Sequence, residues 1–265
     1  MRSLKVKKVS FGFDQIFAAL LLGAASLLAA APAAAQSSAT AEHYALIVNG
    51  DDSFTHNENV AIALAALPHL GYAPGNTYLL APDSAAKAAD PAAAPAWHQR
   101  ASDSGLRQAV AQLQRRLRPG DELLVYLTGH GFRLFGRTSL GLQSGTITAN
   151  ELMKRLGELP FGRLVLVADP CYSGGFVNAA IALGRNTVAV ASTDDLHEVR
   201  CEPFVRPFWI AASAAPNVTV EAAFQVVEDS LLQGGGAAAG DRPQYAASGS
   251  CAGHSNSFST DNGGR

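Results

Sequence analysis

Two short apolar runs in this chain each lead into a residue that can take part in nucleophilic catalysis. Residues 123–127 precede His130 in the sequence Thr-Gly-His-Gly, and residues 164–168 precede Cys171 in the sequence Asp-Pro-Cys. Both runs are apolar at every position, which is typical of parallel strands buried on both faces. Because open α/β folds place their sites at the carboxyl ends of such strands, neighbouring strands would bring His130 and Cys171 together as base and nucleophile.

The rest of the chain alternates between strand-like and helix-like segments. Further strands are predicted at residues 44–48, 77–80 and 187–191, and a short last strand at 242–247. Helices are predicted at residues 59–67, 106–117 and 222–232, and after a capping box at 148–151. This alternation predicts an α/β fold, a three-layer α/β/α sandwich around a mainly parallel sheet of about six strands.

Two segments lack the regular periodicity of the others. Residues 81–103 are rich in Ala, Pro and Asp, which predicts an exposed loop, and the Gly-rich alternation over residues 132–147 predicts a small hairpin. The segment beyond residue 251 is rich in Ser, Asn and Gly, and we expect residues 252–265 to form a disordered tail.

The first 35 residues have the pattern of a signal peptide. Four basic residues precede an apolar stretch, residues 16–31, and the small residues at 33–35 suit cleavage near Ala35. The alternative is a retained membrane anchor, although this stretch is short for one. Cleavage predicts a periplasmic or secreted protein with no integral membrane segment, a short linker at 36–42 and a catalytic domain at 43–251.

The charge of the chain argues against some classes of partner. Residues 1–35 carry four basic groups and one acidic group, so their removal changes the formal net charge from −2 to −5. A mildly acidic chain without a basic cluster is not expected to bind nucleic acid or an anionic membrane as its main partner. The sequence also lacks metal-ligand spacings, a Cys-x-x-Cys pair and a Gly-rich phosphate loop, so we expect catalysis without a metal or cofactor.

Three cysteines are compatible with one disulfide and one free thiol. In an oxidising compartment, a bridge between Cys201 and Cys251 would leave Cys171 as the unpaired thiol. Such a bridge would close a loop of about 50 residues and contribute about 3–4 kcal/mol if it were unstrained. The alternative is three unpaired thiols.

The residues around the two strand ends suit acyl transfer. A thiol needs a base at neutral pH, and a thiolate–imidazolium pair between Cys171 and His130 would lower the pKa of the thiol. The backbone N–H groups of Gly131 and Cys171 are candidates for an oxyanion hole. The structural alternatives are that Cys171 is an inert buried cysteine and that His130 is an ordinary loop histidine. Because both residues follow buried strands, catalysis explains the pair more simply than two separate structural roles do.

The two motifs resemble those of the caspase-like cysteine peptidases. The sequences Thr-Gly-His-Gly at 128–131 and Asp-Pro-Cys-Tyr-Ser-Gly-Gly at 169–175 match both halves of that family's pattern in order. Weaker matches at 191–195, 208–211 and 242–244 are most similar to the bacterial legumain-like members, over roughly residues 43–249. The resemblance implies a caspase-like sandwich, with His130 as the base and Cys171 as the nucleophile.

The resemblance also implies how the P1 residue of a substrate is recognised. Asp169 stands at the position that often forms the floor of the S1 pocket, and Glu198 lies about where the family has a small pocket-wall residue. Together they would favour Arg or Lys at P1, or hydrogen-bond an Asn. The other interpretation of Asp169 is a carboxylate that caps backbone N–H groups. The chain departs from the legumain pattern at two places: Thr55 stands where that family has an Arg, and Ser53 stands near the position of its third catalytic residue, an Asn.

The function predicted from these residues is that of an exported cysteine endopeptidase, which cleaves peptide or protein substrates through a thioester acyl-enzyme. A transpeptidase or ligase would use the same Cys171 and His130 and would differ only in the amine that resolves the thioester. The alternative from another class is a non-catalytic module that keeps the fold in order to bind peptides. A thiol oxidoreductase is disfavoured because no resolving cysteine lies near Cys171 in the sequence. The oligomeric state is left open.

Overall fold

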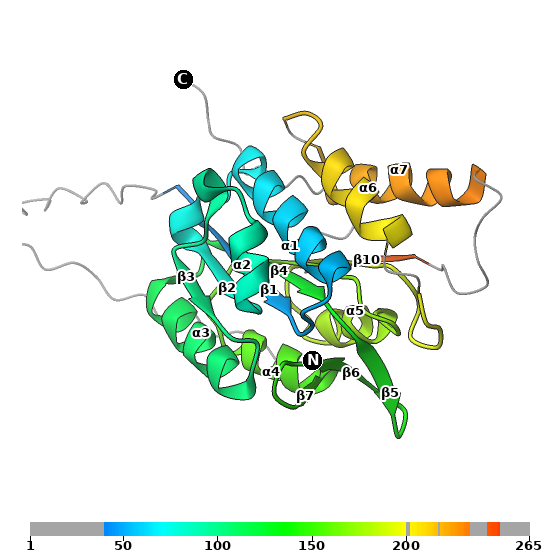
Figure 1. Ribbon diagram of the computed structural model, residues 1–265, viewed down its shortest axis with the longest axis horizontal. Coiled ribbons are helices and arrows are strands. Elements are labelled where there is room, and N and C mark those ends of the chain that lie inside the picture. Colours follow the sequence, from blue (N-terminus) through cyan, green and yellow to red (C-terminus); the bar gives the residue numbers. More distant parts are fainter. Residues whose placement is uncertain (1–39, 200–201, 217, 234–242, 250–265) are drawn as a thin grey trace, which may run out of the picture. The chain divides into compact units, whose positions relative to one another are not determined.

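Figure 1 shows the computed structural model, which describes residues 40–199, 202–216, 218–233 and 243–249. The predicted signal peptide, Cys201, Cys251 and the predicted tail lie outside the described residues. No helix of the described part is long and apolar enough to cross a membrane.

A seven-stranded sheet forms the centre of the fold. Its strands in chain order are β1 (His43–Asn49), β2 (Thr77–Leu80), β3 (Trp97–Gln99), β4 (Glu122–Thr128), β8 (Arg163–Ala168), β9 (Thr187–Ala191) and β10 (Gln244–Ser248). Across the sheet the order is β10-β9-β8-β4-β1-β2-β3, and every pair is parallel except the antiparallel pair of β9 and β10. The mainly parallel α/β sandwich predicted from the sequence is confirmed.

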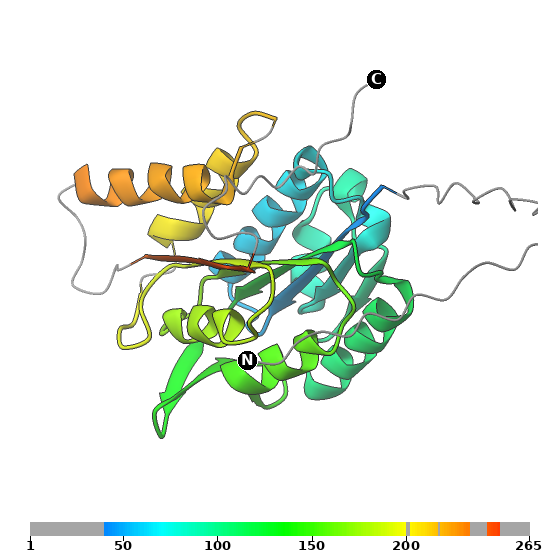
Figure 2. The same ribbon diagram turned by 180° about the vertical axis from the view of Figure 1, so that it is seen from behind.

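Helices cover both faces of this sheet (Figures 1 and 2). One face packs against α1 (Phe54–Ala66), α2 (Asp83–Ala88), α6 (Glu202–Ala212) and α7 (Val220–Gln233). The other face packs against α3 (Asp103–Arg116), α4 (Ala149–Gly157) and α5 (Gly174–Ile181). Alternate residues of the central strands point to opposite faces, so β4 sends Val125 into one apolar core and Tyr126 into the other.

Residues 81–103, predicted as an exposed loop, contain α2, the short 3-10 helix η3 (Pro91–Ala93) and the edge strand β3. That prediction was wrong because pairing with β2 and burial determine this structure, and neither leaves a periodic pattern in an Ala-rich segment. Trp97, for example, pairs with Tyr78 across the two strands and packs against the core at partial exposure. The strand β3 also accounts for the seventh strand of the sheet.

The predicted hairpin is part of a second, three-stranded antiparallel sheet of β5 (Gly131–Leu134), β6 (Arg137–Gly141) and β7 (Thr146–Thr148). The predicted capping box after it opens α4, where the Thr148 hydroxyl accepts a hydrogen bond from the Glu151 N–H at 3.2 Å. The helix α5, directly after the cysteine motif, was not predicted. It has only eight residues and begins with two glycines, which gives little helical signal in the sequence.

Two further 3-10 helices, η1 (Leu67–Leu70) and η2 (Pro74–Asn76), connect α1 to β2. The predicted helix at 59–67 is the second part of α1, whose first turn reaches back to Phe54 and carries His56. This extension matters for the site described below, because it places the polar start of α1 beside the end of β4.

Candidate active site

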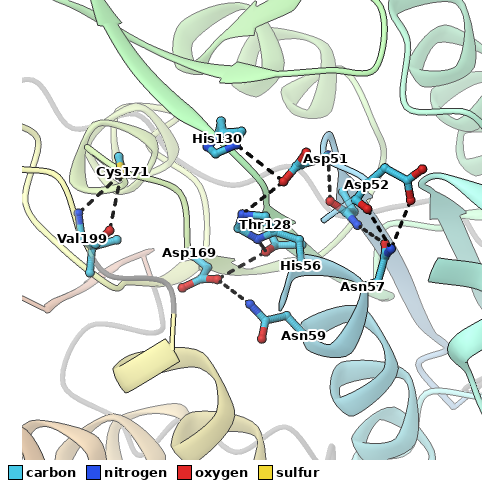
Figure 3. A network of polar contacts seen from close by, with 11 residues as sticks. Asp51, Asp52, His56, Asn57, Asn59, Thr128, His130, Asp169, Cys171 and Val199 are labelled. Atoms are coloured by element: carbon cyan, nitrogen blue, oxygen red, sulfur yellow. Dashed lines mark hydrogen bonds and ion pairs between the residues drawn. The ribbon is translucent and has the colours of Figure 1, made fainter. Parts of the chain in front are cut away.

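The segments that follow β1, β4 and β8 come together at the carboxyl edge of the sheet (Figure 3). The strand β4 lies between the other two, with Asn49 of β1 opposite Thr128 and Leu127 opposite Ala168 of β8. The Asp169 N–H extends this ladder by donating to the Leu127 carbonyl at 2.9 Å. The sheet order therefore brings the histidine and cysteine motifs to adjacent strand ends, as the sequence predicted.

The backbones of the two motifs are in direct contact. Gly131 packs so closely on the main chain of Cys171 that a Cβ atom on Gly131 would lie 2.0 Å from the Cys171 carbonyl oxygen. The side chain of His130 is 68% exposed, and Cys171 is a half-buried free cysteine. The two side chains thus stand at one edge, held there by contacts between backbones.

The thiol of Cys171 is covered by the peptide of Val199. Its Sγ accepts from the Val199 N–H at 3.5 Å and donates to the Val199 carbonyl at 3.6 Å. Burial raises the pKa of the Cys171 thiol against the opposing effect of the hydrogen bond from Val199, and the nearby carboxylates of Glu198 and Asp169 raise it further. The pKa was expected to fall through pairing with His130; in this state the thiol instead contacts a peptide group, and the acidic neighbours disfavour a thiolate.

The segment 194–199 is held against the turn that carries the cysteine. Tyr172 has a left-handed backbone (φ 62°), and its N–H donates to the His197 carbonyl at 2.9 Å. The Asp194 carboxylate contacts the His197 ring at 2.6 Å. Although burial opposes it, the hydrogen bond from His197 lowers the pKa of Asp194. Asp194, to which the sequence assigned no role, is one of the groups that hold the segment covering Cys171.

Asp169 is completely buried beneath the strand ends. Its Oδ2 accepts from the Asn59 amide at 3.2 Å and from the Thr128 hydroxyl at 3.3 Å. Burial raises the pKa of Asp169 well above its ordinary value, against the opposing effect of these two hydrogen bonds. Burial therefore makes ionisation of Asp169 less favourable than it would be in water.

Glu198, the second residue predicted to line an acidic pocket, is exposed, and its carboxylate accepts from the Tyr172 hydroxyl at 3.0 Å. The structure thus does not bring Glu198 and Asp169 together on one open wall. The reason is that Thr128 and Asn59 hold Asp169 inside the sheet edge, where it acts more as an internal hydrogen-bond acceptor than as a surface charge. A role of either residue in P1 selection stays a prediction.

A further carboxylate, which sequence reasoning treated only as part of a turn, lies beside His130. The Oδ2 atom of Asp51 is 3.6 Å from the Nε2 atom of His130 and 3.8 Å from the Nε2 atom of His56. The Nδ1 atom of His56 lies 2.9 Å from the hydroxyl of Thr128. A chain of polar contacts therefore runs from His130 to Asp169 (Figure 3). The sequence signal for Asp51 is its place just after a buried strand.

Two other features of the site region are relevant to ligand binding. A cavity of about 230 Å³ lies beside the cysteine turn, between β6, α4 and α5, and includes Thr138, Asn178 and Asp195 in its lining. Neither His130 nor Cys171 lines it. Within the residues that the structure describes, no group of three or more His, Cys, Asp or Glu side chains is arranged to hold a metal ion.

Comparisons with known proteins support the class of the fold and, at a distance, a superfamily. No protein-family model matches the chain. Metacaspase-4 of Arabidopsis thaliana is 29% identical over 106 residues, which are 35% of this chain and 25% of the plant protein. The chain thus spans about a quarter of the length of that relative. This match supports the caspase-like superfamily, and it does not support the narrower resemblance to bacterial legumain-like peptidases.

A solved structure has a similar overall fold. A protein from Geobacter sulfurreducens, determined as a structural-genomics target, matches with a TM-score of 0.52 and 13% sequence identity. The match covers 78% of this chain and 94% of that protein. At this identity the likeness is evidence for the fold alone.

Proposed function

We propose that this chain is a caspase-like cysteine endopeptidase in which Cys171 is the nucleophile and His130 the general base. The observation that carries the proposal is the contact between Gly131 and the Cys171 backbone, because it places the histidine and cysteine motifs at one point of the sheet edge. The partial similarity to a plant metacaspase agrees with this assignment.

The reaction follows from the two side chains. The sulfur of Cys171 attacks the carbonyl carbon of the scissile peptide bond while its proton passes to His130. The C–N bond breaks, His130 returns the proton to the leaving amine, and a thioester remains on Cys171. Water then attacks the thioester and gives its proton to His130, the C–S bond breaks, and the sulfur of Cys171 takes the proton back.

The register of β5 supports Gly131 as an oxyanion donor. The Gly141 N–H donates to the His130 carbonyl at 2.8 Å, and in an antiparallel pair hydrogen-bonded and non-hydrogen-bonded positions alternate. Gly131, opposite Leu140, therefore falls at a non-hydrogen-bonded position, and its N–H points away from β6. With the N–H of Cys171, this group would stabilise the developing oxyanion. The thiol would give up its contacts with the Val199 peptide as its sulfur attacks a substrate carbonyl.

The proposed P1 preference is for Arg or Lys, or for Asn. Its support is Asp169, whose Oδ1 atom is buried without a hydrogen-bond partner among the described residues. A cationic or amide side chain reaching this atom would supply the missing donors and, if cationic, would favour the carboxylate over the acid. Glu198, exposed beside Tyr172, would add negative charge on the surface near the cysteine turn.

The alternative is a non-catalytic module that binds peptides through the same fold. The observation that favours it is the state of Cys171, whose thiol is capped by Val199 and has a raised pKa. A peptidase and a peptide-binding module would have the same contacts in this site. Only the peptidase would cleave the peptide, so turnover distinguishes the two functions.

We also propose that the protein is exported after cleavage near Ala35, which places it in the periplasm or outside the cell. The support is the basic start and the apolar stretch at residues 16–31 of the sequence. The N-terminal sequence of the protein purified after expression of the full chain is the check. A start near Gln36 is expected, and an intact Met1 in exported material would contradict the proposal.

The test of the peptidase is turnover of fluorogenic peptides that vary at P1, under reducing conditions. Wild-type protein is expected to cleave after Arg or Lys, Cys171→Ala to be inactive, and His130→Ala to lose about 10²–10⁴-fold in kcat, the usual contribution of a general base. His69→Ala, at an exposed histidine far from the motifs in sequence, is the matched control and should keep full activity.

Two outcomes of this assay would change the assignment. If wild-type protein shows no more turnover than Cys171→Ala at any P1 residue, the chain is not an active peptidase, and peptide binding without cleavage would identify the module. If Asn is preferred to Arg and Lys, the peptidase stands, and the part of the argument in which negative charge selects a basic P1 residue is wrong.

A further inference from the structure

The carboxylate of Asp51 is the acidic group nearest to His130 at the sheet edge. Its Oδ2 atom lies 3.6 Å from Nε2 of His130, an ion-pair distance longer than a hydrogen bond. The same oxygen lies 3.8 Å from Nε2 of His56, and the two imidazole rings meet edge to face with 5.7 Å between centroids. Figure 3 shows Asp51 between the two histidines.

The loop after β1 holds Asp51 in this place through hydrogen bonds of its backbone and of the Asn49 side chain. The Asp51 N–H donates to the side-chain oxygen of Asn49 at 2.9 Å, and the Asn49 amide donates to Asn57 of α1 at 3.1 Å. The Gly50 N–H donates to the Thr128 carbonyl at 3.3 Å. The loop is thus tied to α1 on one side and to the end of β4 on the other, so the carboxylate is positioned before any substrate binds.

The surroundings of Asp51 favour its charged form. Burial alone would raise its pKa, but a hydrogen bond from Ser53 and the nearby ring of His130 lower the pKa of Asp51. Its Oδ2 atom is buried and has no hydrogen-bond donor among the described residues. An ionised oxygen shielded from water, with two imidazoles as its neighbours, is an acceptor available for a ring N–H.

The two histidines are not equivalent partners for this oxygen. His56 is buried and its Nδ1 is already in contact with Thr128. Burial lowers the pKa of His56, against the opposing effect of Asp51, and the proximity of His130 lowers it further. His56 is therefore favoured in the neutral form, whereas His130 projects into solvent, where a substrate would meet it. The other charged neighbour of Asp51 is Asp52, which bonds to Asn57 and Ser84.

We propose that Asp51 is a positioning residue for His130: its carboxylate accepts the Nε2–H of the ring and leaves Nδ1 as the nitrogen that takes the proton of Cys171. The assignment rests on the proposed peptidase function. A carboxylate in this place fixes the tautomer and the orientation of the base, as second partners of catalytic histidines do. The 3.6 Å separation shortens to a hydrogen bond when the substrate excludes water, since catalytic contacts are often long in the free enzyme.

The test compares Asp51→Asn with Asp51→Glu and with Asp52→Asn as the matched control. Asp52 is the adjacent acid in the same loop, but its bonds go to Asn57 and Ser84 and not to a histidine. Asp51→Asn is expected to lower kcat about 10²-fold with KM unchanged, which is less than the roughly 10⁴-fold known for a directly bonded catalytic carboxylate. Asp51→Glu should recover part of the loss, and Asp52→Asn should retain near wild-type kcat.

A second readout does not depend on activity. The ¹⁵N chemical shifts of the His130 ring report which nitrogen carries the proton, and they can be recorded on full-length Cys171→Ala protein with and without the Asp51→Asn change. We expect the Nε2–H tautomer to dominate with Asp51 present and its population to fall in the Asn variant. Thermal unfolding of each variant shows whether the fold is retained.

The outcomes separate the two proposals. If wild-type protein cleaves no peptide but the tautomer changes with Asp51, the peptidase assignment fails while the contact between Asp51 and His130 stands. If wild-type protein is active and Asp51→Asn matches Asp52→Asn in kcat and in tautomer, Asp51 does not position His130. An equal loss of kcat in Asp51→Asn and Asp51→Glu, with an unchanged tautomer, would also overturn the assignment.

Discussion

At the scale of single residues, Gly131 occupies the closest approach between the two motif-bearing segments. A Cβ atom there would lie 2.0 Å from the carbonyl oxygen of Cys171 and 2.8 Å from both its carbonyl carbon and its nitrogen. Backbone atoms cannot rotate out of the way as a side chain can, so any larger residue must push the two segments apart. The same glycine is the proposed oxyanion donor, which ties the packing of the site to its chemistry.

Gly131→Ala is accordingly expected to affect both activity and stability. Loss of one aligned oxyanion donor costs about 10²–10³-fold in kcat, and overpacking against a backbone costs about 1–3 kcal/mol of unfolding free energy. Peptide turnover and urea unfolding measure the two effects. Gly75→Ala is the control, because a Cβ atom at Gly75 meets nothing within 4 Å. Equal turnover and equal stability in the two variants would show that the close contact at Gly131 is not needed.

At the scale of elements, the helix α6 supplies the largest side chain of the core that packs on β4. Trp209 is fully buried and meets the Tyr126 ring of β4 edge to face, with 5.2 Å between centroids and planes at 78°. Phe208 stands next to it, with ring centroids 5.4 Å apart. Such aromatic contacts contribute beyond the area that they bury. Helix α6 therefore supports the strand whose end carries His130.

Trp209→Ala is expected to lower the unfolding free energy by about 3–5 kcal/mol, as aromatic-to-alanine changes in a core do. Urea denaturation followed by circular dichroism measures it. Ile210→Ala is the matched control on the same helix, because Ile210 is 60% exposed; its effect should stay within about 0.5 kcal/mol. A loss at Trp209 no larger than that at Ile210 would contradict the packing described here.

At the scale of the whole sheet, the edge opposite the site has its own buried polar cluster. Glu122 opens β4, is 1% exposed, and lies 2.8 Å from a guanidinium nitrogen of Arg163 at the start of β8. The Tyr72 hydroxyl donates to the same carboxylate. Burial raises the pKa of Glu122 against the opposing charge of Arg163. Since β4 is seven residues long, this cluster lies about 20 Å from the site at the rise of a strand.

Glu122→Ala would leave Arg163 without its carboxylate partner, and breaking a buried pair in this way costs about 3–5 kcal/mol of unfolding free energy. Turnover per folded molecule should not change, because the cluster lies at the far end of β4. Glu58→Ala, which removes the exposed pair with Arg206 at 3.5 Å, should cost less than about 1 kcal/mol. Chemical denaturation and kcat are measured on the same samples of each variant. A drop in kcat for Glu122→Ala without a loss of stability would contradict this prediction.

Much of this architecture was predictable from the sequence because its signals are local. A run of five apolar residues, such as 164–168, indicates a buried strand whatever surrounds it, and the alternation with helices implies a parallel sheet. The strand β3 and the helix α5 were not predicted, and of the second sheet only a hairpin was. Short elements at the edge of a fold depend for their structure on contacts with neighbouring elements, which the local sequence does not show. For instance, Trp97 lies in a strand because it pairs with Tyr78 of β2, and not because of the residues around it in the sequence.

The sequence by itself determined that His130 and Cys171 follow buried strands and that glycines adjoin both motifs. Only the tertiary structure decided what surrounds them: Asp51 and His56 beside the histidine, Val199 over the thiol, and Asp169 inside the sheet edge. These contacts join residues that lie from 28 positions apart, as for Cys171 and Val199, to 110, as for Asn59 and Asp169. The physical reason is that strand formation depends on local periodicity, whereas side-chain contacts at an edge depend on sheet order, register and burial, which distant segments set together.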